Sequence, residues 1–303
     1  MAMITCPLTH SPDVTLLKTF DSDALIDAWQ HDFQVDISSE FTHATTIQLY
    51  RSNPTQLQFF APGNLAGSAR LYQQLQKFSW YYRPDRWEHR RALRDLCDRT
   101  QTVLEIGAGV GDFVQRGRQL GLDIAGIELN HDAAARAQAQ ALPVTATDLA
   151  SLVADRAATF DAVCSFQVLE HIAEPRRFIE QSVQLLKPMG YLIFSVPNCE
   201  SFTQHGEFLL DMPPHHVTRW SQAAFKSLET LFPLQLLSAC CEPLDPEHIE
   251  IYTKTYYHFF HDLSLLTRIA FNHHVLPLYR YVLERGLHRW LPGMSLYVVF
   301  RKL

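Results

Sequence analysis

An apolar strand that runs directly into a glycine-rich turn is the feature that most constrains what this chain can fold into. Residues 103–113 read VLEIGAGVGDF, with Gly107, Gly109 and Gly111 between the strand and the next helix. Glycines allow a tight turn and a close approach of the backbone to a ligand, and the first N–H groups of the helix are free to bind it. The segment predicts a ligand-binding turn at the carboxyl end of a strand in an α/β sheet.

Strands and helices are expected to alternate over residues 100–243. The expected strands cover 102–107, 123–128, 143–146, 160–166, 191–196 and 234–241, and the expected helices cover 111–120, 131–140, 174–186 and 221–232. Such alternation is typical of a mostly parallel sheet with helices on both faces. A last strand is expected at residues 295–302.

Three regions differ in their composition. Residues 1–65 are polar, with short apolar pieces and many turn formers, which predicts a small β-rich lobe. Residues 66–100 are expected to form a helical linker or lid, and residues 101–303 the main domain. Within that domain, residues 244–294 interrupt the alternation with a long helical insertion rich in aromatic residues and histidine.

The composition excludes several classes of protein. With 303 residues, the chain fits one large α/β domain or two modest ones. Its formal net charge of −6 argues against a general nucleic-acid binder. The six cysteines have no framework spacing, the N-terminus does not read as a signal peptide, and no run of about 18 apolar residues occurs. We therefore expect a cytoplasmic protein with reduced thiols.

Acidic side chains follow three successive expected strands. Glu105 lies two residues before the first glycine, Glu128 ends the second strand, and Asp148 follows the third. The G-x-G-x-G spacing is one residue shorter than the dinucleotide pattern, and Glu105 would repel a pyrophosphate. The pattern favours a cationic ligand such as S-adenosylmethionine (SAM) over NAD, with Glu128 on the ribose and Asp148 on the adenine. The alternative is that Glu128 and Asp148 are solvated loop acids.

Four segments together resemble the class I SAM-dependent methyltransferases. FDAVCSFQVLEHI (160–172) and LLKPMGYLIFSVPN (185–198) join the glycine turn and GIELN (126–130) in this resemblance. It implies a Rossmann-like α/β sheet that is mostly parallel, with an antiparallel last strand. The VLEH form is similar to the branch that includes ubiquinone-pathway O-methyltransferases and glycan- and natural-product-tailoring methyltransferases.

The resemblance also implies which residues bind the cofactor. They are Glu105, Gly107, Ala108, Gly109, Gly111, Glu128, Leu129, Asp148, Gln167 and Val168.

Three histidines are candidates for the catalytic base. An alcohol acceptor benefits from a base near its proton, and histidine suits neutral pH. His171 follows the fourth strand, and His215 and His216 lie in MPPHHVTRW, a segment that similar enzymes place near the acceptor pocket. We rank His216 first and His171 second for this role.

Other roles for these residues stay open. Glu170 and His171 can instead cap the next helix or orient each other, and the histidine pair can belong to a rigid loop packed under Trp220. Some relatives hold a divalent ion near the Glu-His pair, which would make Glu170, His171 and His216 ligands, but we expect no metal.

The front of the chain is similar to a subset of these enzymes from bacterial surface-glycan and natural-product pathways. Their N-terminal lobe often binds zinc through two C-x-x-C pairs. Here the first pair is reduced to Cys6 with Thr9, and the second falls near Ser52 and Thr55. One thiol cannot hold structural zinc. We predict a metal-free, degenerate zinc-ribbon-like lobe that serves as a lid or substrate platform.

Two further segments could meet an acceptor or a partner. The stretch 252–292 suits an extra helical layer or a homodimer interface, or else an amphipathic surface for a membrane or a lipid-linked acceptor. In residues 80–91, Tyr81, Tyr82 and Trp87 suit stacking on a sugar or aromatic ring, although aromatic residues at this density are more often core.

These patterns predict a SAM-dependent methyltransferase that methylates a hydroxyl on a sugar, glycan precursor or secondary metabolite. The expected partner is a small-molecule or glycan acceptor and not a nucleic acid. The alternatives are N- or C-methylation of a small molecule, or a SAM-binding scaffold without catalysis.

Overall fold

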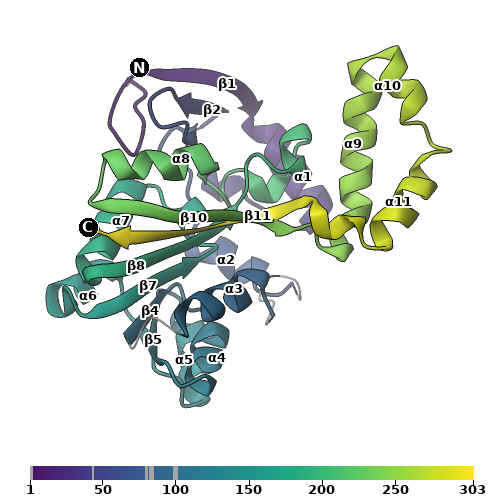
Figure 1. The fold of residues 1–303 in the computed structure, drawn as a ribbon. Helices are drawn as coiled ribbons and strands as arrows, with labels where there is room; N and C mark the ends of the chain where they lie inside the picture. Colours follow the sequence, from purple (N-terminus) through teal and green to yellow (C-terminus); the bar gives the residue numbers. More distant parts are fainter. Residues whose placement is uncertain (1–2, 43, 79–80, 82–84, 98–101) are drawn as a thin grey trace.

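The computed structural model describes residues 3–42, 44–78, 81, 85–97 and 102–303. The strands in this part of the chain form two sheets. A 4-stranded sheet has the order β1-β2-β3-β9, and a 7-stranded sheet has the order β10-β11-β8-β7-β4-β5-β6. Figure 1 shows the larger sheet at the centre of the molecule, with helices on both sides of it.

The larger sheet confirms the predicted fold class. It consists of β4 (Thr102–Ile106), β5 (Asp123–Glu128), β6 (Val144–Ala146), β7 (Phe160–Phe166), β8 (Leu186–Pro197), β10 (Leu234–Pro243) and β11 (Pro292–Lys302). Strands β4 to β8 pair in parallel, whereas β11 is antiparallel to both β8 and β10. The carboxyl ends of the parallel strands therefore meet at one edge, where ligands of such sheets bind.

Helices bury their apolar faces against both sides of this sheet. One side carries α3 (Trp87–Leu96), α4 (Asp112–Gln119) and α5 (His131–Ala139), and the other carries α6 (Leu149–Arg156), α7 (Pro175–Leu185) and α8 (Gln222–Ser227). Phe113 and Ala134 belong to the first apolar cluster, and Ile179 and Phe225 to the second. Burial of these two layers is the main source of the domain's stability.

Local signals explain where the elements differ from the sequence-based expectation. The alternation predicts no helix over 149–156, but α6 forms there because Asp148 caps it, accepting hydrogen bonds from the backbone N–H and the hydroxyl of Ser151 at 2.8 and 3.0 Å. Strand β8 begins five residues earlier than expected, since Leu186 already pairs with Phe160. The helix expected over 221–232 ends at Ser227 and continues as a 3-10 turn.

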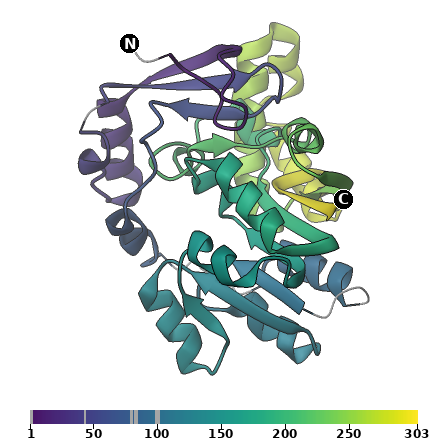
Figure 2. The same cartoon turned by 90° about the vertical axis from the view of Figure 1, so that its left-hand side faces the viewer.

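The N-terminal lobe contains more than strands. It comprises β1 (Val14–Asp21), α1 (Ser22–Phe33), β2 (Thr46–Ser52), β3 (Gln58–Ala61) and α2 (Ala69–Leu75). Helix α1 buries Trp29 in the lobe's own apolar cluster, which Met212 and Val217 also join. The fourth strand of the lobe's sheet is β9 (Thr218–Arg219), from the main domain. Figure 2 shows the lobe, in purple, packed beside the main domain.

The four positions of the degenerate zinc motif meet in the structure. The Cys6 Sγ lies 3.8 Å from the Thr55 hydroxyl. Burial raises the pKa of the Cys6 thiol, but hydrogen bonds with Ser52 and Thr9 outweigh it and lower the pKa overall. One sulfur and three hydroxyls do not fit a closed tetrahedral zinc site. That the lobe holds no metal in solution stays a prediction.

The insertion projects from the body of the molecule as a group of helices. It consists mainly of α9 (Ile249–Leu263), α10 (Leu265–Ala270) and α11 (Leu276–Glu284), and it ends where β11 begins at Pro292, slightly before the predicted limit. Leu266 and Trp290 are 79% and 86% exposed. Among the described residues, no helix has the length and apolar character needed to span a bilayer.

Candidate functional site

A pocket of about 1050 Å³ opens at the carboxyl ends of the parallel strands. Most predicted site residues line it, namely Gly107, Gly109, Glu128, Leu129, Asp148, Gln167, Val168, His171, His215 and His216. Glu105, Ala108 and Gly111 are not part of its wall. The pocket therefore joins the predicted cofactor turn to the predicted histidines.

The glycine turn needs glycine for two separate reasons. Gly107, Gly109 and Gly111 have φ angles of 79°, 54° and 87°, which side chains rarely adopt. A Cβ on Gly107 would also lie 2.4 Å from a methyl group of Val168. Close packing continues below the turn, because a Cβ on Gly126 of β5 would lie 2.5 Å from the Ala108 side chain. The turn is thus fixed by its neighbours before any ligand binds.

Glu128 holds the turn with both carboxylate oxygens. One oxygen accepts a hydrogen bond from the Gly109 N–H and the other from the Asn130 N–H, each at 2.8 Å. A carboxylate oxygen has a second lone pair, so Glu128 can still accept hydrogen bonds from a ligand in the pocket. Leu129, which follows it, is 70% exposed and presents an apolar surface to the same space.

The other two predicted acids are placed differently from Glu128. Glu105 is buried under the turn, and one of its carboxylate oxygens has no hydrogen-bond partner among the described residues. Burial raises the pKa of Glu105 well above its usual range, against the opposing effect of Arg86. Asp148 lies on the pocket wall, where each of its oxygens accepts one hydrogen bond in the cap of α6 and keeps a second lone pair for a ligand.

The chain after β7 closes the cofactor end of the pocket. Gln167 has a φ of 56° and donates its N–H to the Ser195 carbonyl at 2.7 Å. This turn directs Val168 against Gly107, as the Cβ contact shows. The two residues therefore lie where the sequence predicts them, between the glycine turn and the histidines.

Distant segments bring the three histidines together. His171 ends the 3-10 turn that follows β7, whereas His215 and His216 precede β9. The Val217 N–H donates to the Glu170 carbonyl at 2.9 Å, and the Phe60 N–H of β3 donates to the Val217 carbonyl at 3.0 Å. The histidine pair is thus held between the lobe and the main domain. The ring centroids of the three histidines lie 4.3 to 4.8 Å apart.

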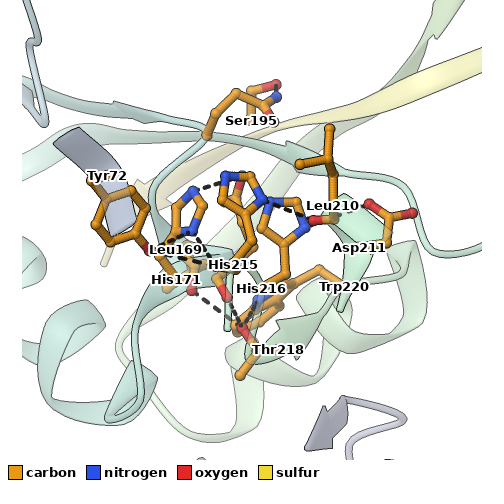
Figure 3. A network of polar contacts seen from close by, with 12 residues as sticks. Tyr72, Leu169, His171, Ser195, Leu210, Asp211, His215, His216, Thr218 and Trp220 are labelled. Carbon is orange, nitrogen blue, oxygen red and sulfur yellow. Dashed lines mark hydrogen bonds and ion pairs between the residues drawn. The ribbon is translucent and has the colours of Figure 1, made fainter. Parts of the chain in front are cut away.

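Each imidazole meets an oxygen through its Nδ1 atom. His171 Nδ1 lies 2.6 Å from the His215 carbonyl, His215 Nδ1 lies 2.9 Å from the Leu210 carbonyl, and His216 Nδ1 lies 3.4 Å from an Asp211 oxygen. Figure 3 shows the three rings side by side between Tyr72 and Asp211. A carbonyl can only accept a hydrogen bond, so we assign the proton to Nδ1 and the lone pair to Nε2 in the neutral rings.

Burial keeps this cluster uncharged. It lowers the pKa of His171 to about 4, and it lowers the pKa of His215 and His216 well below the usual range, with the neighbouring histidines adding to the shift. Burial likewise raises the pKa of Glu170 to about 8, and it raises the pKa of Asp211. Neutral imidazoles can accept a proton or donate a lone pair to a metal ion.

The structure decides against one alternative role for the Glu-His pair. Helix α7 has Glu174 at its N-cap and no side-chain cap hydrogen bond, so neither Glu170 nor His171 caps it. Their closest nitrogen and oxygen atoms are 4.0 Å apart, too far for a hydrogen bond. The segment of the histidine pair does lead into the fully buried Trp220, whose indole N–H donates to the Thr218 hydroxyl at 3.0 Å.

Two residues of the site carry no clear signal in the sequence. The Tyr72 hydroxyl lies 3.1 Å from His171 Nδ1, although 99 positions separate the two residues. Asp211 orients His216, and only its position shortly before the histidine pair could have indicated it. Of the predicted aromatic wall, Tyr81 and Trp87 line the pocket, and Tyr82 lies outside the described residues.

Comparisons with known proteins agree with this geometry. A family model described as a methyltransferase domain matches residues 79–255. The ubiquinone biosynthesis O-methyltransferase of Paraburkholderia phymatum is 33% identical over 102 residues, which are 32% of this chain and 44% of the relative. The protein of the same name from Alkalilimnicola ehrlichii is 29% identical over 134 residues, which are 40% of this chain and 53% of the relative. The chain thus spans about half the length of the curated relatives it matches.

A solved structure shows the same fold. The crystal structure of a SAM-dependent methyltransferase from Archaeoglobus fulgidus superposes with a TM-score of 0.50 and 17% identity, covering 76% of this chain and all of that one.

Proposed function

This chain belongs to the class I SAM-dependent methyltransferase family, and from that membership we propose that it transfers a methyl group from SAM to a hydroxyl oxygen. The acceptor that we propose is a sugar, a glycan precursor or a secondary metabolite. The observation that carries the proposal is the single pocket that joins the glycine turn and Glu128 to three buried, neutral histidines.

The residues of the cofactor end fit SAM, the cofactor of this family. The left-handed glycine turn brings bare backbone to the pocket wall at Gly107 and Gly109, and Glu128 keeps lone pairs for the two ribose hydroxyls. Leu129 would cover the adenine with apolar surface. The unpartnered oxygen of Glu105 lies under the turn, and the cationic methionine end of SAM beside it would favour the ionised carboxylate, whereas a pyrophosphate would repel it.

The chemistry asks two things of the protein, alignment and removal of a proton. Bound SAM supplies a methyl group that is already activated on its sulfonium, so the protein mainly aligns the acceptor. In our proposal the acceptor hydroxyl lies against the histidine cluster and loses its proton there. His216, held through Nδ1 by Asp211, is the best-oriented histidine for this role.

The test combines binding and turnover. Isothermal titration with SAM, its demethylated product and NAD should give binding of the first two only. Incubation with methyl-labelled SAM and a panel of hydroxylated sugars and aromatic metabolites should then label an acceptor. Binding of NAD in place of SAM would contradict the proposal. Binding of SAM without transfer to any acceptor would favour the non-catalytic scaffold, and transfer to nitrogen or carbon would favour the other alternative.

A second part of the proposal concerns the partner of the insertion. Leu265, Leu266 and Ile269 on α10 are 63% to 79% exposed, and Arg268 lies among them. Apolar side chains next to a cation suit the surface of an anionic membrane or the lipid part of a lipid-linked acceptor. A homodimer is the alternative. We also place the protein in the cytoplasm, since all six cysteines are free thiols.

Vesicle flotation tests this part. The protein should float with vesicles that contain anionic lipid, and L265D/L266D should remain at the bottom of the gradient. A protein that ignores vesicles but whose sedimentation shows a dimer, broken by the same double variant, would make the helices a dimer interface instead.

A further inference from the structure

The histidine cluster has the arrangement of a metal centre. We infer that His171, His215 and His216 bind one divalent transition-metal ion, with Zn²⁺ the ion that best matches their donor atoms, and that the Glu170 carboxylate supports it. The inference rests on the proposed methyltransferase function and deepens it, because the ion would hold the acceptor hydroxyl and would replace His216 as the group that promotes loss of its proton.

The spacing of the donor atoms suits a single ion. One ring nitrogen from each histidine lies within 4.8 Å of the others. In a tetrahedral zinc site with bonds of about 2.0–2.1 Å, two ligand atoms are roughly 3.3 Å apart. Small rotations of the three rings would close this difference. The rings already lie side by side, and no backbone movement is needed to bring them there.

The hydrogen bonds of the cluster have the pattern that metal-binding histidines use. A metal-ligating imidazole usually donates its other N–H to a carbonyl or a carboxylate, which fixes the ring and its tautomer. Here all three Nδ1 atoms meet such an oxygen, two of them carbonyls and one the Asp211 carboxylate. The Nε2 lone pairs of His215 and His216 are thereby left available as ligands, and His171, which also bonds to the Gln167 backbone, would exchange that bond for the ion.

Two buried polar groups lack the partners that burial normally requires. Neither oxygen of Glu170, which is 1% exposed, has a hydrogen-bond partner in another described residue. The same holds for Nε2 of His215, which is 7% exposed. An unsatisfied buried polar atom destabilises the fold, because it has given up its hydrogen bonds to water without replacing them. A cation on the histidine cluster would satisfy His215 Nε2, and its charge would be close to the Glu170 carboxylate, one oxygen of which lies 4.0 Å from His171 Nε2.

The chemistry of the donors selects the class of ion. Imidazole nitrogens favour zinc, iron, nickel or copper, whereas magnesium and calcium favour oxygen ligands. Three histidine ligands leave a position open toward the pocket, into which an acceptor hydroxyl can enter. A bound ion lowers the pKa of such a hydroxyl, so that it ionises near neutral pH. Ion binding and direct proton transfer to His216 use the same lone pair and exclude each other.

Metal binding can be measured without any acceptor. The full chain, stripped with a chelator, is titrated with ZnCl₂ by calorimetry and with Co²⁺ by visible absorption. One ion should bind per chain, and Co²⁺ should show the intense bands of four-coordinate geometry. His215→Ala should weaken Zn²⁺ binding at least 100-fold, and Glu170→Gln about 10- to 100-fold. Unchanged SAM binding shows that each variant is folded.

A second histidine pair in the chain provides the matched control. His273 and His274 are adjacent and exposed, with ring centroids 3.9 Å apart. His273→Ala/His274→Ala should leave the Zn²⁺ affinity unchanged. The inference is overturned if His215→Ala keeps the wild-type Zn²⁺ affinity, if the control loses the ion instead, or if the stripped wild type binds no ion.

Turnover separates this inference from the proposed function. Full methyl transfer by a metal-free enzyme would overturn the metal inference and leave the methyltransferase standing, with His216 as the direct base. If the ion binds through His215 but the protein methylates none of the acceptors, the metal site stands and the proposed methyl transfer is contradicted.

Discussion

The two ends of the pocket are built in different ways. At the cofactor end, Gly107, Gly109 and Glu128 lie within one β-α-β unit, and the Gly109 N–H donates directly to Glu128. At the acceptor end, His171 meets Tyr72 from 99 positions earlier and His215 from 44 positions later. One end is a local supersecondary structure, and the other exists only where the lobe and the main domain meet.

This difference separates the consequences of mutation. A change at the cofactor end should affect SAM binding through backbone geometry alone. A change at the acceptor end should spare SAM binding and alter catalysis, since its residues act on the other substrate. The comparison would be wrong if a change at the acceptor end weakened SAM binding, or if a change at the cofactor end left SAM binding unchanged.

The largest effect is expected from His216→Ala. Removal of the imidazole should lower kcat about 10²- to 10⁴-fold and leave the Kd for SAM nearly unchanged. Steady-state kinetics and calorimetry measure the two quantities. Asp211→Asn removes the negative charge beside His216 Nδ1 but keeps the imidazole, so it should lower kcat less. Equal activity of the His216 variant would remove it from the mechanism.

Gly107→Ala should act at the cofactor end. The new Cβ meets Val168 at 2.4 Å at a φ of 79°, so the turn must shift and SAM affinity should fall at least about tenfold. Gly121→Ala is the matched control, because Gly121 has a φ of 85° but open space around it. That variant should lose only about 1 kcal/mol of stability and bind SAM normally. If both variants bind SAM equally, the contact with Val168 is not what shapes the turn.

A smaller effect is expected from Tyr72→Phe. The hydroxyl contacts His171 Nδ1 and the His215 carbonyl at 3.1 and 3.5 Å, and its loss leaves the ring packing intact. The variant should lose about 0.5–1.5 kcal/mol of stability and some kcat, with the Kd for SAM unchanged. A weaker SAM affinity would show that the two ends are coupled.

The last prediction concerns stability alone, and it depends on a single histidine beside the cofactor end. His89 packs between Phe113 and Phe166, and burial, helped by Arg86, lowers its pKa to about 3. The folded state stays neutral while the unfolded state binds a proton below pH 6.5, so stability falls as the pH drops from 6.5 toward 3. The slope from His89 is at most about 1.4 kcal/mol per pH unit. Urea unfolding at pH 7 and pH 5 should therefore show a smaller loss for His89→Leu than for wild type, and an equal loss would contradict this origin.

Much of the main domain could be predicted because its signals are local. The strand-turn-helix at Gly107 and the acid at the end of β5 are readable within a few residues. Helix α6 was missed because an Asp148 cap can equally be read as a ligand-binding acid. Helix α1 was missed because its burial depends on tertiary packing of Trp29 rather than on a strong local pattern.

By itself the sequence determined the mostly parallel sheet, the glycine turn and the acid that holds it, since backbone conformation and neighbouring pairings specify them. Only the tertiary structure decided that three histidines share one cluster with Asp211 and Tyr72. Those contacts form when β9 completes the lobe's sheet and Val217 bonds to the turn after β7. The physical reason is that these hydrogen bonds and this burial join segments far apart in the chain. No local sequence pattern specifies which distant segments pack together.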